Sequence, residues 1–112
     1  MNSTENRTEY LPLGSVVRLK GGVKKLMIIA RGLAVKLDGE EKFFDYGGVQ
    51  YPEGLSGDEI AYFNHDGILK TVFEGYSDED DKIMVEAINE FRDKRGLEKG
   101  DPYQMNKEKG RV

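Results

Sequence analysis

Alternating apolar and polar positions predict a series of short strands in the first two thirds of the chain. Val17 and Leu19 alternate with Arg18 and Lys20, which is the period of a strand with one buried face. Residues 25–30 are apolar after the initial lysine, and such a run is typical of a central strand covered on both sides. Similar patterns predict further strands at 33–37, 41–46, 49–51, 60–64 and 71–76.

Glycines stand at nearly every corner between these strands. Gly21-Gly22 offers a two-residue hairpin turn, and Asp38-Gly39 is the strongest hairpin signal in the chain. Gly32 allows a bend, and Gly47-Gly48 is expected to interrupt the strand that contains it. Short strands with glycine corners tend to coil. The pattern therefore predicts a small, strongly bent antiparallel β-sheet or partial barrel of four to six short strands.

A single helix is expected after the last strand. Ser77 is a good N-cap residue, acidic residues follow it, and Gly96 ends the helical pattern. The helix should cover the open face of the sheet, which makes the fold class α+β. The apolar stripe that would face the sheet consists of Ile83, Met84, Ala87, Ile88 and Phe91.

The length of 112 residues and the 38% of hydrophobic residues fit one domain with one modest core. Residues 1–9 are polar and are expected to form a disordered arm, and residues 10–96 to form the domain. Residues 97–112 are rich in charge and are expected to form a flexible tail.

Charge is unevenly distributed along the chain, whose formal net charge is −4. Six basic and no acidic residues lie between Tyr10 and Leu37, whereas fifteen acidic and three basic residues lie between Asp38 and Glu90. One interpretation is that the two halves pair with each other in the fold. The other is that the basic segment meets an acidic partner. The negative net charge of the whole chain argues against general binding of nucleic acid.

The residues that usually carry catalysis or bind metal are scarce. The chain has no cysteine, so disulfides, thiolate metal sites and a cysteine nucleophile are excluded. His65 is the single histidine, and no nucleophile or metal-ligand set has a recognisable spacing around it. We therefore expect no enzyme activity, no cofactor and no metal. The polar start and the short apolar runs predict a cytoplasmic protein with no membrane insertion.

Aromatic residues cluster around the glycine corners at 47–48 and 52–54. Phe43 and Phe44 are neighbours on one predicted strand, so they should point to opposite faces of the sheet. Tyr46 and Tyr51 follow on the same stretch. Such aromatics either complete a second small core or remain exposed, where they can anchor a protein partner or stack on bases.

Six segments of the chain carry a resemblance to a known family, in the order 11–17, 24–29, 44–46, 51–54, 63–65 and 72–76. The family that they resemble is a domain-of-unknown-function family of Gram-positive bacteria. Its members are encoded beside type VII secretion genes and the polymorphic toxins that this pathway exports. The resemblance covers residues 10–90 approximately and implies a dedicated chaperone or adaptor for one toxin, with no catalytic motif.

We accordingly expect a non-catalytic protein-binding module that binds a secreted toxin encoded nearby. An immunity protein that neutralises the same toxin is the main alternative, and a small-barrel RNA-binding protein is a further one. The uninterrupted charge of the first hairpin and the nearby tyrosines make the candidate partner-binding residues Arg18, Lys20, Lys24, Lys25, Tyr46 and Tyr51.

Overall fold

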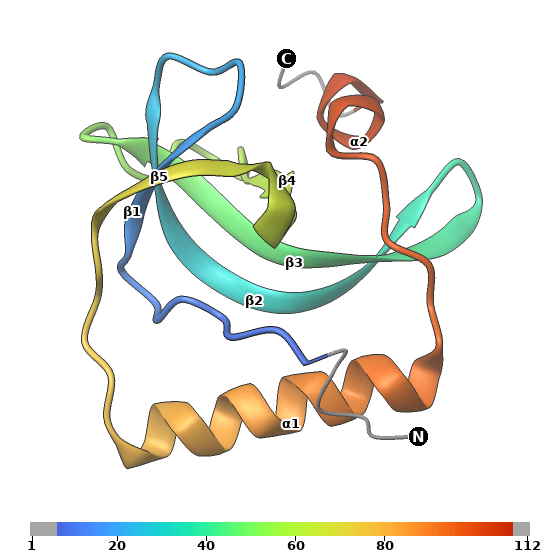
Figure 1. The fold of residues 1–112 in the computed structure, drawn as a ribbon. Helices are drawn as coiled ribbons and strands as arrows, with labels where there is room; N and C mark the ends of the chain where they lie inside the picture. Colours follow the sequence, from blue (N-terminus) through green and yellow to red (C-terminus); the bar gives the residue numbers. More distant parts are fainter. Residues whose placement is uncertain (1–6, 109–112) are drawn as a thin grey trace.

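The computed structural model describes residues 7–108 of the chain, in which five strands form one antiparallel sheet and two α-helices pack against it (Figure 1). The α+β class and the single long C-terminal helix predicted from the sequence are confirmed. In chain order the elements are β1 (Val16–Leu19), β2 (Lys25–Leu37), β3 (Glu40–Tyr51), β4 (Ala61–Phe63), the 3-10 helix η2 (His65–Gly67), β5 (Ile68–Phe73), α1 (Glu79–Arg95) and α2 (Pro102–Glu108).

The order of the strands requires the sheet to bend strongly. The order across the sheet is β4-β3-β2-β1-β5, so β4 and β5 lie at opposite edges although only residues 64–67 separate them in sequence. In a flat sheet the two edges would be about 19 Å apart. Residues 64–67, which are mostly one 3-10 turn, can span only about 13 Å between the end of β4 and the start of β5. The edges must therefore approach each other, which confirms the predicted bent sheet.

The hairpin of β2 and β3 is the longest part of the sheet and curves through the molecule (Figure 1). Asp38 and Gly39 both have positive φ, as a two-residue hairpin turn of the expected type requires. Gly32 has a positive φ of 64°, but residues 33–37 continue the same strand and do not form a separate one. Two strands are thus longer than the short strands that the sequence predicted.

Gly47 and Gly48 lie inside β3 and do not interrupt it, which corrects the expectation from the sequence. Both pair with β2 on one side and with β4 on the other. A Cβ atom on Gly48 would lie 2.9 Å from the carbonyl oxygen of Met27 and 3.1 Å from the Phe63 ring. These positions lack side chains because neighbouring backbone and rings pack closely on them, and not because the chain turns there.

Helix α1 begins one residue later than predicted. The carboxylate of Asp78, and not Ser77, caps it by accepting a hydrogen bond from the backbone N–H of Asp81 at 3.1 Å. Gly96 ends the helix in the left-handed conformation with φ of 62°, as predicted.

The face of α1 that packs on the sheet is rotated from the predicted apolar stripe. Ile88 is buried as expected, but Ile83 and Met84 are 61% and 51% exposed, and Phe91 is partly exposed. The most buried residue on the helix is the polar Asn89, which is even less exposed than Ile88. The prediction of the buried face was therefore wrong for most of the stripe.

Two contacts with β2 set this rotation. Arg31 forms an ion pair of 2.8 Å with Asp81, and both side chains are largely buried. At the next residue of β2, Gly32 has no side chain, and a Cβ atom there would lie 2.7 Å from a methyl group of Ile88. The helix consequently presents residues 81, 85, 88 and 92 to the sheet, at the spacing of one helical face.

Phe43 and Phe44 point to opposite faces of β3 and are both fully buried. Both are buried because each face of the sheet is covered at this point, one by α1 and the other by the C-terminal segment. The larger core contains Tyr10, Val17, Leu26, Ile28, Phe43, Tyr46, Phe63 and Ile88. The smaller core contains Leu37, Phe44 and Met105.

Residues 97–108 are part of the fold, which overturns the flexible tail expected at 97–112. The backbone of Phe43 donates to Glu98 and accepts from Gly100, both at 2.9 Å, so the segment pairs with β3. Met105 of α2 is then fully buried in the smaller core. Residues 109–112 lie outside the described part of the chain.

The predicted arm at 1–9 is also corrected where it can be described. The side-chain amide of Asn89 accepts a hydrogen bond from the N–H of Thr8 at 2.9 Å and donates one to the carbonyl of Thr8 at 3.0 Å. This paired contact holds residues 7–10 on α1. Residues 1–6 lie outside the described part. Within residues 7–108, neither α-helix is long and apolar enough to cross a membrane.

Candidate partner-binding surface

The edge of the sheet at β4 is covered by the C-terminal segment. The side-chain amide of Asn106 accepts from the N–H of Tyr62 at 2.9 Å and donates to its carbonyl at 3.0 Å. One asparagine thereby occupies the hydrogen-bonding groups that a neighbouring strand would use. This edge is closed to further strand pairing at Tyr62.

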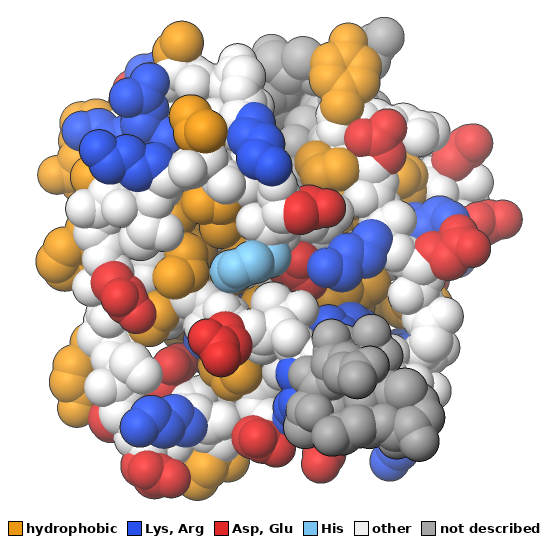
Figure 2. Space-filling view, in the orientation of Figure 1, with side chains coloured by type: hydrophobic (Ala, Val, Ile, Leu, Met, Phe, Trp, Pro, Cys, Tyr) orange, Lys and Arg blue, Asp and Glu red, His pale blue; other side chains and the backbone are white. Residues whose placement is uncertain are grey.

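The edge of the sheet at β5 is open. In the described part of the chain, β5 pairs only with β1, and no strand lies on its outer side. Its apolar side chains face solvent, since Leu69, Val72 and Phe73 are 64%, 45% and 60% exposed. Figure 2 shows hydrophobic side chains along the margin where Figure 1 places β5 and the segment leading into α1. We call the outer side of Ile68–Phe73 the β5 edge.

Three cationic side chains stand in a row across the strands next to this edge. Arg18 of β1 lies directly opposite Lys25 of β2 and Lys70 of β5, so the three project from one face of the sheet. We call Lys25, Arg18 and Lys70 the basic row. None of them forms an ion pair with the acidic side chains of residues 7–108. Like charges directly opposite each other destabilise a sheet, so the row costs stability in the isolated domain.

An exposed tyrosine extends the basic row. Tyr51 lies opposite Lys25 on β3, and the Lys25 ammonium is 5.3 Å from the centre of its ring. Tyr51 is 44% exposed. The structure thus brings Arg18, Lys25 and Tyr51, three of the candidate residues from the sequence, onto one exposed surface.

The other three candidate residues are placed differently. Lys20 is exposed in the loop after β1, and Lys24 in that loop forms an ion pair of 2.9 Å with Glu53. The hydrogen bond from Lys24 lowers the pKa of the Glu53 carboxyl group. Tyr46 is fully buried, so its predicted contact with a partner is wrong. Its position inside the bent sheet, stacked on Phe63, explains its burial.

Lys70 was missed by sequence reasoning. It lies in the acidic segment between Asp38 and Glu90, more than fifty residues from Arg18, and no local pattern pairs the two. The alternation of side chains along β5 places Lys70 beside Arg18 only when the pairing of β5 with β1 is already known.

A buried polar cluster lies around Asp45, on the other side of the strand from the smaller core. Its carboxylate is fully buried and accepts hydrogen bonds from the Tyr10 hydroxyl at 3.1 Å, the backbone N–H of His65 at 2.8 Å and Lys99 Nζ at 2.7 Å. The side chain of Asn64 joins the backbone of Asp45 to that of Gly100. A buried carboxylate with these partners is well satisfied, and the cluster ties distant segments together.

The hydroxyl of Tyr46 belongs to the same region. It accepts a hydrogen bond from the N–H of Leu11 at 2.9 Å and forms a second one, of 2.7 Å, with His65 Nδ1. Burial raises the pKa of Tyr46 to about 12. Burial, and then the nearby Asp45, raises the pKa of Tyr10 far above its usual value. Both hydroxyls therefore keep their protons at neutral pH, and the Tyr10 hydroxyl donates its proton to Asp45.

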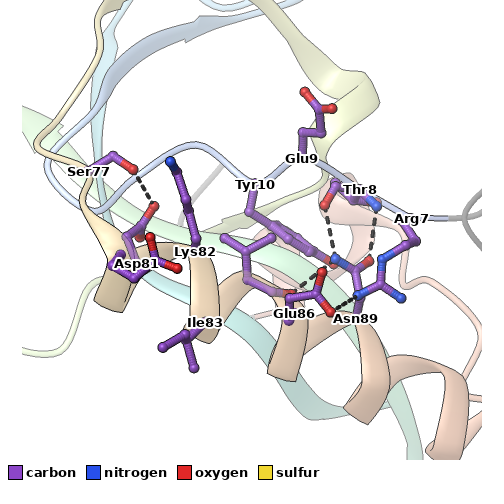
Figure 3. Close-up of a pocket in the computed structure, with 12 residues that line it drawn as sticks. Arg7, Thr8, Glu9, Tyr10, Ser77, Asp81, Lys82, Ile83, Glu86 and Asn89 are labelled. Carbon is purple, nitrogen blue, oxygen red and sulfur yellow. Dashed lines mark hydrogen bonds and ion pairs between the residues drawn. The ribbon is translucent and has the colours of Figure 1, made fainter.

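A groove of about 730 Å³ lies between residues 7–10 and α1 (Figure 3). Polar side chains that line it are engaged with each other: Arg7 pairs with Glu86 at 3.0 Å, and Asn89 holds Thr8. These contacts fix the N-terminal segment to the helix. In residues 7–108, no three histidine, aspartate or glutamate side chains are grouped so that they could hold a metal ion.

Comparison with known families matches residues 10–84 to the Domain of unknown function (DUF4176). This match covers more than half of the 112 residues, and the chain belongs to this family. No curated protein and no solved structure matches the chain. The matched range includes the whole sheet with its basic row, whereas Lys99, Met105 and Asn106 lie outside it.

Proposed function

We propose that this member of the family is a non-catalytic protein-binding module that acts as a cytoplasmic chaperone or adaptor for a toxin exported by a type VII secretion system. The observation that carries the protein-binding function is the β5 edge with its basic row. It combines exposed backbone hydrogen-bonding groups, exposed apolar side chains and cations without acidic partners in the described chain.

A protein partner explains this combination better than a nucleic acid does. An extended peptide can use the free backbone groups of an edge strand, whereas a phosphate backbone cannot supply a matching ladder. The chain also has a net charge of −4, and nucleic-acid-binding domains are usually basic. A partner with acidic residues would be attracted to the basic row and repelled by much of the remaining surface, which favours one orientation of binding.

The connection with secretion is supported by the resemblance of the six sequence segments alone. The same resemblance supports an immunity protein as the alternative, because a chaperone and an immunity protein both bind the toxin. The two roles differ in where they act on the toxin. An immunity protein blocks the toxic activity, and a chaperone holds the toxin in a form that can be exported.

Co-expression with the toxin encoded beside the gene tests the proposal. We expect the full-length chain to co-purify with that toxin and to increase its soluble amount or its export, without restoring growth to cells that make it. Restored growth with no effect on export would replace the chaperone by the immunity role. A failure to co-purify would refute both roles.

Binding of RNA tests the remaining alternative. An acidic protein should bind a random single-stranded RNA no more tightly than about 10⁻⁴ M at physiological salt. Submicromolar binding that weakens steeply with salt, measured by fluorescence anisotropy, would make RNA binding the better assignment.

A further inference from the structure

We propose that the partner binds by adding an extended segment to the β5 edge as a sixth strand, with an acidic side chain placed beside Lys70. This inference rests on the proposed protein-binding function and specifies its mode and the chemistry of the partner. It assigns the recognition to backbone hydrogen bonds along β5 and to charge along the basic row.

The first argument is the shape of the surface next to β5. A groove of about 580 Å³ is lined by residues 68–71, four consecutive residues of the strand. Leu11, Lys20 and His65 also line the groove, together with the acidic residues Glu9 and Asp66. A groove that follows a strand edge for four residues is the space an added strand would occupy, because neighbouring strands lie about 4.8 Å apart.

The second argument is the charge of the row. Lys70 is the outermost member, and its inner neighbour Arg18 has the same sign. A strand added to β5 would place one of its side chains opposite Lys70 on the same face of the sheet. A carboxylate at that position would place a negative charge next to Lys70, at the outer end of the basic row, and would offset the repulsion among its three cations. The segment that fits this edge is therefore acidic at the position facing Lys70.

The third argument concerns the apolar side chains of the same strand. Phe73 lies opposite Val16, three residues from Lys70 and beyond a register shift in the pairing of β1 with β5. It is 60% exposed, so an apolar side chain of an added strand would cover it. Acidic and apolar residues within one extended segment thus match the two ends of the β5 edge.

A second copy of this chain is a poorer occupant than an acidic segment of another protein. Pairing two β5 edges would bring two basic rows side by side, across one strand spacing. Lysines on edge strands are a common means of preventing such self-association. The basic row therefore both opposes dimerisation through β5 and attracts an acidic segment.

The probe for this proposal is an eight-residue peptide in which glutamate alternates with valine, with both ends blocked. Successive backbone N–H groups of an extended peptide point to opposite edges. Two further forms of the peptide therefore carry N-methyl groups on every second amide, so that each form blocks the N–H groups of one edge. A lysine-for-glutamate peptide is the charge control. Binding to the full chain is followed through the backbone amide signals of residues 68–73 in NMR spectra.

We expect the glutamate peptide to shift these signals at millimolar concentration and the lysine peptide not to do so. One of the two N-methylated forms should lose binding, because its methyl groups face β5, and the other should retain it. Lys70→Glu should weaken binding about fivefold or more. The matched variant Lys36→Glu, which reverses a lysine at the far end of β2, should bind as the unaltered chain does.

Four results would overturn the proposal: no shift at β5, equal binding of both N-methylated forms, equal binding to Lys70→Glu, or displacement of the peptide by an RNA oligonucleotide. The unaltered chain could instead form a dimer whose amount rises with concentration and which the acidic peptide dissociates. That result would assign β5 to self-association. Failure of the mode is distinguishable from failure of the function. If the toxin co-purifies equally with Lys70→Glu and the unaltered chain, strand addition is refuted while protein binding stands.

Discussion

The two edges of the sheet are treated in opposite ways. At β4 the amide of Asn106 takes both backbone groups of Tyr62, and α2 covers the strand. At β5 no part of residues 7–108 pairs with the outer side of the strand, and its apolar side chains remain exposed. Edge strands promote unwanted association, so proteins normally protect them. That this domain closes one edge and leaves the other open indicates that the open edge has a use.

The closed regions share one device, which is an asparagine amide that binds backbone groups of a distant segment. Asn106 does this at β4, Asn89 holds Thr8 on α1, and Asn64 joins β3 to Gly100. The β5 edge has no such asparagine among the described residues. The chain therefore contains a means of closing exposed backbone and does not apply it at β5.

The largest expected effect comes from emptying the smaller core that supports the closed edge. Met105→Ala should lower the free energy of unfolding by about 3 kcal/mol, because it removes a fully buried side chain. Urea denaturation measures this change. Met84→Ala is the matched control, since Met84 is half exposed on α1, and it should cost less than about 1 kcal/mol.

Equal losses for the two methionine variants would contradict the assignment of the C-terminal segment to the fold. The comparison also decides the orientation of α1. A large loss for Met84→Ala would restore the helix face that the sequence predicted.

Alkaline pH should weaken the polar cluster that ties the N-terminal segment to β3. Below about pH 10, tyrosines are neutral in both the folded and unfolded chain, so this contribution to stability is constant. Above it, the unfolded chain releases protons that the folded chain retains, because the folded pKa of Tyr46 is raised to about 12 and that of Tyr10 is raised further. Each of the two should cost about 1.4 kcal/mol at pH 11.

Urea denaturation between pH 8 and pH 11 measures this dependence. Tyr46→Phe should be less stable at pH 8 but should lose less stability on going to pH 11. Tyr51→Phe, at an exposed ring on the open side of the molecule, serves as the control. An unchanged dependence in Tyr46→Phe would argue that Tyr46 is not buried in the folded protein.

A direct way to open the closed edge is Asn106→Ala. It leaves the N–H and carbonyl of Tyr62 without partners, and we expect a loss of about 1.5 kcal/mol. The amide proton of Tyr62 should also exchange faster with solvent, which hydrogen-exchange NMR detects. Gln104→Ala, at an exposed position of the same helix, should change neither quantity appreciably. Unaltered exchange at Tyr62 in Asn106→Ala would show that something else protects the edge.

Features that depend on neighbouring residues could be predicted from the sequence. The Asp38-Gly39 turn and the end of α1 at Gly96 each follow from backbone conformations that those residues adopt easily. The bent antiparallel sheet follows from frequent glycines and short alternating runs. The position of the helix in the chain follows from its cap and its charges.

Features that depend on distant contacts could not be predicted. The face of α1 is set by Arg31 and Gly32 of β2, and the apolar pattern of the helix alone favours a different rotation. The C-terminal segment looks like a charged tail because Met105 is the one fully buried apolar side chain among residues 97–106. One apolar side chain in a polar stretch gives no periodic signal.

The candidate surface was predicted in part for the same reason. Arg18 and Lys25 come from one local hairpin, so their proximity follows from the sequence. Lys70 joins them through a strand pairing that spans about half the chain. Tyr46 was assigned to the surface because its burial depends on the curvature of the sheet around it.

The smallest expected effect is also the most informative about the open edge. Lys70→Glu places a carboxylate beside Arg18 and removes one of the like charges of the basic row, so it should raise the free energy of unfolding by about 0.5 kcal/mol. Lys36→Glu is the reverse case, because Lys36 lies opposite Glu41, and it should lower stability by a similar amount. Urea denaturation at low and at high salt measures both changes, and 1 M salt should reduce them. A variant that gains stability while it loses the partner would show that the basic row is kept for binding. A loss of stability in Lys70→Glu would instead mean that Lys70 supports the fold and that the two edges differ less than their hydrogen bonds indicate.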